Sequence, residues 1–147
     1  KEDAMSSDPI SLARDMIDAF NAGDRERFRA SLAPDAVERE HATQTTVNGA
    51  DAAVAHDFAW REAFPDARGE VASAIAEGDR VALQITWTGT HDGELRGPDG
   101  SSIPATGRRV TVPACMVLEV RDGAIASSDH YFDLLTLLGQ IGAAPAG

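Results

Sequence analysis

His130 combines a titratable side chain with apolar surroundings, and this combination is typical of a proton-transfer site. Ala126, Ser128, His130 and Phe132 alternate with other residues, so their side chains share one face of a predicted strand. The facing strand presents Val110, Val112, Ala114, Met116 and Leu118 on the same side. Burial in such a wall removes water from an imidazole and shifts its pKa toward the neutral form. An unperturbed pKa of about 6.5 needs little tuning for catalysis, so we predict that His130 transfers a proton.

Glu38 is the second candidate for this chemistry. A short strand predicted over residues 36–41 carries it, and inside a shared cavity its carboxylate would orient His130 or share a proton with it. The alternative for both residues is a structural role. In that case Glu38 is a solvent-exposed strand residue, and the imidazole of His130 hydrogen-bonds to Ser128 or Asp129.

Large and small side chains near these groups are candidates for substrate binding. They are Trp60, Phe64, Ala114, Met116, Ser128 and Phe132. The same residue types build ordinary cores, so their identity alone does not separate a pocket wall from a core.

Metal and nucleotide sites are not predicted. His41 and His56 are expected on the outer surface, no two histidines are spaced i, i+4, and no dense acidic or cysteine cluster accompanies them. The chain has neither a GxGxxG nor a GxxxxGK[ST] motif. We therefore expect no cofactor and no metal.

Helical spacing dominates the first part of the chain. Asp8 is a predicted N-cap with Pro9 at the first helical position, and the helix continues to about residue 20. Asp24 is expected to cap a short second helix. A third helix is predicted over residues 49–64, where Pro65 ends it.

After Pro65 the period changes to two, which predicts strands. Two long hairpins are expected, with turns at residues 77–79 and 122–123. A loop rich in Gly and Pro lies between them, over residues 93–107, and is expected to rim a site. Helices that precede the sheet should pack on one of its faces, so the sequence predicts an α+β fold.

Composition indicates one acidic domain. The 147 residues suffice for a single core, and no apolar run approaches the length of a membrane span. A net charge of −11 disfavours nucleic acid and anionic membranes as partners. The single cysteine, Cys115, suits a reducing compartment, and we expect a cytoplasmic protein. Residues 1–4, ahead of Met5, are expected to be a cloning remnant.

Self-association is also expected. Ile85, Trp87 and Val117 are interpreted as exposed apolar strand positions, and such positions favour a homodimer or a higher homo-oligomer.

Five motifs resemble those of the SnoaL-like polyketide cyclases, members of the nuclear-transport-factor-2-like superfamily. They are ARDMIDAFNAGD, FPDAR, GTHDGELRG, TGRRV and YFDLLTLLGQIG, and the resemblance spans residues 11–142. It implies one domain over residues 7–143, folded as a cone-shaped barrel in which a curved antiparallel or mixed sheet wraps around N-terminal helices. The family's cyclases close polyketide rings by aldol chemistry without a cofactor. Related proteins hydrolyse epoxides, isomerise steroids or only bind a ligand.

The resemblance also assigns positions. His130 falls where the cyclases have an aspartate that acts as general acid and base, and Glu38 falls at a family asparagine. The cyclases have polar side chains at the two positions that correspond to Ala114 and Met116 in this chain. His91 matches the histidine of the GTH element and Asp133 matches the acidic residue after the aromatic pair, so both join the catalytic candidates, with a structural role as the alternative.

Two functions follow as hypotheses. The first is a cofactor-independent acid/base enzyme, of cyclase or isomerase type, that acts on an apolar oxygenated small molecule such as a polyketide. The second is a non-catalytic carrier of a small hydrophobic ligand. An epoxide hydrolase is less favoured, because residues 110–120 lack the paired arginine and aspartate of those relatives. His130 and Glu38 facing one cavity would favour the enzyme.

Overall fold

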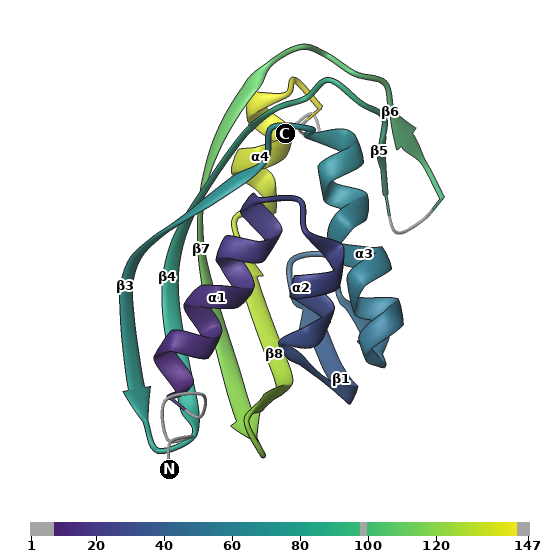
Figure 1. The fold of residues 1–147 in the computed structure, drawn as a ribbon. Coiled ribbons are helices and arrows are strands. Elements are labelled where there is room, and N and C mark those ends of the chain that lie inside the picture. Colours follow the sequence, from purple (N-terminus) through teal and green to yellow (C-terminus); the bar gives the residue numbers. More distant parts are fainter. Residues whose placement is uncertain (1–7, 98–99, 144–147) are drawn as a thin grey trace.

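One curved sheet of six strands forms the body of the protein, and α1, α2 and α3 lie on its concave side (Figure 1). The computed structural model describes residues 8–97 and 100–143, so the expected cloning remnant at residues 1–4 lies outside the described part. The elements in chain order are α1 (Pro9–Asn21), α2 (Arg25–Ala30), β1 (Leu32–Glu40), β2 (Thr45–Asn48), α3 (Ala50–Ala63), β3 (Arg68–Glu77), β4 (Arg80–Thr90), β5 (Leu95–Arg96), β6 (Ser102–Ile103), β7 (Arg109–Arg121), β8 (Ala124–Phe132) and α4 (Leu134–Gln140).

The helix signals in the sequence are confirmed. The Asp8 side chain accepts from the amide of Ile10 at the start of α1, and Asp24 caps α2 in the same way. α1 turns an apolar face toward the sheet and buries Ala13, Met16, Ile17 and Phe20. These helices therefore close one side of the core.

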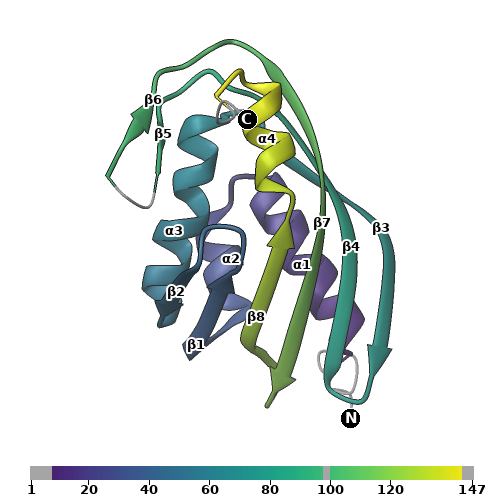
Figure 2. The same ribbon diagram turned by 180° about the vertical axis from the view of Figure 1, so that it is seen from behind.

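The sheet has the order β2-β1-β8-β7-β4-β3. All neighbours are antiparallel except β1 and β8, which run parallel. Both expected hairpins are present, as β3–β4 and β7–β8. Figure 2 shows the sheet from its convex side, with α1 behind it. The fold is thus the predicted cone-like α+β arrangement with a mixed sheet that is not closed.

Several elements differ from the sequence prediction. β1 starts at Leu32 rather than at residue 36, and an irregularity in its pairing with β8 between Leu32 and Val37 accommodates Pro34. β2, the small β5–β6 hairpin and α4 were not predicted. Each is short, so its periodic signal is weak.

The expected exposure of Ile85 and Trp87 is wrong. Ile85 is only 2% exposed and Trp87 is half-buried against the core. Both continue the alternation of Val81 and Leu83, so all four side chains point to the concave face. Val117 points the other way and is half-buried.

None of the described helices combines the length and the apolarity that crossing a membrane requires.

Candidate active site

A cavity of about 120 Å³ lies between the concave face of the sheet and the helices. Its walls are mostly apolar, and its polar side chains come chiefly from β1, β8 and α3. Seven predicted site residues line it: Glu38, Trp60, Phe64, Met116, Ser128, His130 and Phe132. Ala114 is half-buried beside the core but does not line the cavity. His130 and Glu38 therefore face one cavity, which is the arrangement that favours an enzyme.

The register of β1, β8 and β7 explains why these side chains lie together at the cavity. Glu38 and Glu40 are two residues apart on β1, so both side chains point to the concave face. Parallel pairing places Glu38 beside Ser128 and Glu40 beside His130. Across the β7–β8 hairpin, His130 faces Met116.

Asp57 on α3 meets Glu38 and forms a hydrogen-bonded pair of carboxyl groups with it. Burial, followed by the negative charge of Glu38 and their hydrogen bond, raises the pKa of Asp57 well above its usual range. Burial also raises the pKa of Glu38, although the hydrogen bond from Asp57 opposes this shift. Two carboxylates cannot hydrogen-bond without a proton, and the pKa of each group is raised, so the pair holds a shared proton.

Glu38 has an unsatisfied oxygen. Its side chain is buried, and Oε1 has no hydrogen-bond partner among the described residues. A buried polar atom without a partner carries the full penalty of its lost hydration. A donor that reached this oxygen from the cavity would remove that penalty.

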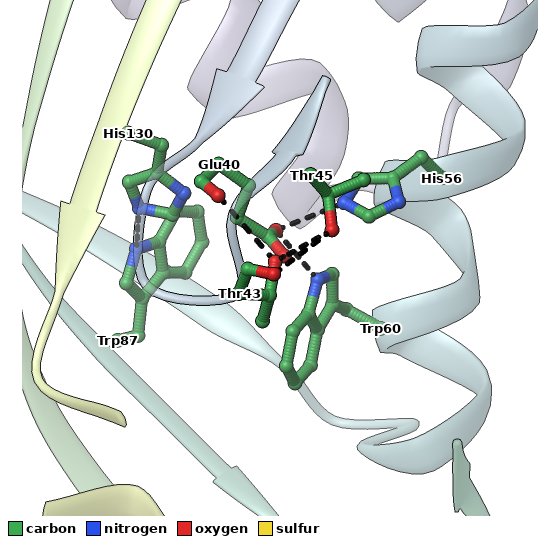
Figure 3. A network of polar contacts seen from close by, with 7 residues as sticks. All are labelled: Glu40, Thr43, Thr45, His56, Trp60, Trp87 and His130. Carbon is green, nitrogen blue, oxygen red and sulfur yellow. Dashed lines mark hydrogen bonds and ion pairs between the residues drawn. The ribbon is translucent and has the colours of Figure 1, made fainter. Parts of the chain in front are cut away.

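Glu40 occupies a different environment, shown in Figure 3. Its Oε2 accepts from Trp60 Nε1 at 2.9 Å and lies 3.0 Å from His56 Nε2, while Oε1 accepts from the Thr43 hydroxyl at 2.7 Å. Burial alone would raise the pKa of Glu40, but the bonds from His56, Thr43 and Trp60 lower it overall. The hydrogen bond to Glu40 raises the pKa of His56 in turn. Glu40 and His56 thus form a charge-matched pair.

His56 corrects the sequence interpretation. Rather than lying on the outer surface, it is half-buried, because it reaches the β1 carboxylate from α3. His41 does lie on the surface, where it pairs with Asp129.

His130 is held by Trp87. The indole Nε1 donates to His130 Nε2 at 3.1 Å, and Figure 3 shows the two rings beside each other. Gly69, opposite Trp87 on β3, makes room for the indole, because a Cβ there would come within 2.5 Å of its ring. Burial lowers the pKa of His130 to about 4, against an opposing effect of Glu40. The imidazole is therefore neutral near pH 7.

This contact also selects the tautomer of His130. Nε2 accepts the indole hydrogen bond and cannot carry a proton, so the neutral ring holds its proton on Nδ1. Nδ1 has no partner within the described part of the chain. His130 is consequently a hydrogen-bond donor in this state.

The structure does not bring His91 and Asp133 to the cavity. His91 is fully buried at the end of β4, where Nδ1 lies 2.9 Å from the Thr106 hydroxyl and the ring packs on Phe64. Asp133 is an exposed N-cap of α4 that accepts from the amide and hydroxyl of Thr136. Neither residue lines the cavity, and the contacts of both match the structural alternative, although Nε2 of His91 has no hydrogen-bond partner among the described residues.

Sequence reasoning missed Asp57 and Glu40. Ala53, Asp57, Trp60 and Phe64 follow the 4-3-4 spacing of one helix face, and all four line the cavity. An acidic residue on an otherwise apolar face was the available signal for Asp57. Glu40 had a simpler signal, because it lies two residues from Glu38 on one strand.

Among residues 8–97 and 100–143, no group of three or more potential metal ligands lies together.

Comparison with protein families identifies this architecture. The model of the SnoaL-like polyketide cyclases matches residues 10–141. The chain belongs to this family. A comparison with curated proteins gives no match.

Solved structures agree with the assignment. A putative SnoaL-like polyketide cyclase from Jannaschia sp. CCS1 is 27% identical, with 93% of each chain covered and a TM-score of 0.82. AclR, a putative hydroxylase from Streptomyces galilaeus, is 33% identical over 93% of this chain and 82% of its own, with a TM-score of 0.78. IdmH, a putative polyketide cyclase from Streptomyces antibioticus, is 30% identical over 91% and 98%, also with a TM-score of 0.78. Family and neighbours support a role of cyclase type on a small molecule.

Proposed function

We propose that this SnoaL-like protein is a cofactor-independent acid/base enzyme that moves a proton on an apolar, oxygenated small molecule such as a polyketide. The Glu38–Asp57 pair, which lines an apolar cavity together with His130, is the observation that carries the proposal. Paired titratable groups whose pKa values differ are the usual sign of acid/base assignments.

Glu38 is the base in this proposal. Its carboxylate takes the proton from a carbon next to a substrate carbonyl, and burial makes it a stronger base than a solvated carboxylate. General base catalysis of this kind contributes about 10²–10⁴-fold. Asp57 keeps its own proton and holds Glu38 in place.

His130 stabilises the charge that develops. Its Nδ1–H donates to the carbonyl oxygen, which becomes the enolate oxygen as the C–H bond breaks. The enolate carbon then attacks a second carbonyl of the same molecule, which forms a ring. In a substrate whose enolate is conjugated with a C=C bond, a more distant carbon of the dienolate instead takes the proton back from Glu38, which gives an isomer. In the ring-forming route the proton on Glu38 passes to the new alkoxide, so Glu38 ends ionised as it began.

Hydrogen exchange tests the proposal without the natural substrate. Apolar ketones such as 1-tetralone are incubated with the protein in D₂O, and deuterium at the carbon next to the carbonyl is measured by NMR. We expect exchange above the buffer rate with the parent, and loss of that excess when both carboxyls are replaced (Glu38→Gln with Asp57→Asn). Equal exchange in the parent and the double variant would contradict the proposal. Ketone binding without exchange would point to a carrier instead.

A further inference from the structure

The charges around the cavity do not balance. Three carboxyl groups line it, from Glu38, Glu40 and Asp57, and the described lining residues include no Lys or Arg. His56 matches the charge of Glu40. Within the described residues no cation forms an ion pair with the Glu38–Asp57 pair, although the charge of His56 also acts on Glu38, so a ligand in the cavity meets this negative charge.

Glu38 Oε1 marks where a ligand would make contact. This atom is buried, lacks a hydrogen-bond partner within the described residues, and belongs to a side chain that lines the cavity. A donor from the ligand would relieve its penalty, and a charged donor forms the stronger bond.

The remaining wall suits a cation with an apolar body. Six aromatic side chains line the cavity: Phe20, Phe28, Trp60, Phe64, Trp87 and Phe132. Aromatic faces attract ammonium groups, and they also cover apolar carbon. An anion would instead meet an unmatched carboxylate in surroundings of low dielectric, where repulsion is weakly screened.

We propose that the cavity binds small protonated amines with an apolar body, with the ammonium group donating to Oε1 of Glu38. Such a ligand occupies the carboxylate assigned above to proton abstraction, so it competes with a neutral substrate. The inference rests on the charge and contacts of the cavity and holds whether or not the protein catalyses a reaction.

Three probes with one carbon skeleton isolate the effect of charge: cyclohexylmethylamine, cyclohexylmethanol and cyclohexanecarboxylate. Affinity is measured by calorimetry at pH 7. The chain has two tryptophans and both line the cavity, so their indole N–H signals in NMR report where each probe binds. We expect the amine to bind at least about tenfold more tightly than the alcohol, and the carboxylate not to bind measurably.

Variants test the assigned contact. Glu38→Gln combined with Asp57→Asn removes the charge, so the amine should lose its advantage while the alcohol still binds. Asp57→Asn alone should keep the advantage, because the amide can donate to Glu38 as the protonated Asp57 does. Glu70→Gln, at an exposed site, is the control for net charge and should change nothing.

Two results would overturn the inference: an amine that binds no more tightly than the alcohol, or an amine preference that survives in the double variant. Retained alcohol binding shows that the double variant is folded, so a loss of amine binding there supports the contact. Ketone exchange uses no amine, so the two proposals can fail separately.

Discussion

The indole nitrogen of Trp87 lies 3.1 Å from Nε2 of His130, although β7 separates their two strands in the sheet. If Nε2 were protonated, its N–H would point at the indole N–H of Trp87 and no hydrogen bond could form. This contact therefore favours the neutral ring with its proton on Nδ1. Trp87→Phe should therefore raise the pKa of His130 above its present value of about 4 and mix the two tautomers. NMR titration of ¹⁵N-labelled histidine measures both. A variant with the parental titration and tautomer would show that burial alone sets the state of this ring.

His130 variants distinguish a donor from a base. Gln can donate from its amide while its carbonyl accepts from Trp87, so His130→Gln should keep much of the ketone exchange. His130→Leu removes the donor and should lower exchange by about 10²–10³-fold. If His130 is the base, both variants lose the rate equally. Deuterium incorporation into 1-tetralone decides between these outcomes.

Asp57→Asn should make the protein more stable near neutral pH. Folding raises the pKa of Asp57 well above 3.8, so above that pH the unfolded chain releases a proton that the folded protein retains. The parent therefore loses stability as the pH rises from about 4 toward the folded pKa, and the amide removes this loss. We expect a gain of about 1 kcal/mol at pH 7 that shrinks below pH 4. Urea denaturation across this range measures it, and a gain independent of pH would contradict the raised pKa of Asp57.

His56→Gln should destabilise the protein by about 1 kcal/mol, because the bond to Glu40 then loses its charged donor. Folding raises the pKa of His56 above 6.5, so its contribution is complete below that pH and fades as the pH rises through the folded value. Folding lowers the pKa of Glu40 below 4.5, so its contribution is complete above that pH and fades as the pH falls. The destabilisation should be greatest between pH 4.5 and 6.5. Thermal unfolding at several pH values checks it, and a uniform effect would mean that the pair carries no charge.

Much of the fold could be predicted because its signals are local. Asp8, Pro9 and Asp24 act within one helical turn, and the alternation of Val81 and Leu83 gives a strand directly. The pairing of β1 with β8 has no local signal, since it joins positions such as Glu40 and His130 that are 90 residues apart.

The contacts within the site were also hard to predict, because they join residues that are far apart in the sequence. On the hypothesis that Glu38 and His130 share a cavity, the sequence favoured a contact between them. Both line one cavity, yet the hydrogen bonds of the structure join Glu38 to Asp57 and His130 to Trp87. By chemistry alone, each of these side chains could hydrogen-bond to several others. The observed pairs depend on the packing of α3 against β1 and on the space that Gly69 leaves for the Trp87 ring, and neither is visible in the local sequence.

The parallel contact between β1 and β8 has a consequence for the order of folding. β8 is the last strand among the described residues, and it joins β1 and β2 to the rest of the sheet. The helices and the β3–β4 hairpin can form as synthesis proceeds, but the cavity gains its full wall only when residues near 130 arrive. Contacts over such separations form slowly. Until then the carboxyl groups of β1 remain hydrated. In a nascent or truncated chain that lacks β8, Glu38 and Glu40 would therefore have the pKa values of ordinary solvated carboxyl groups.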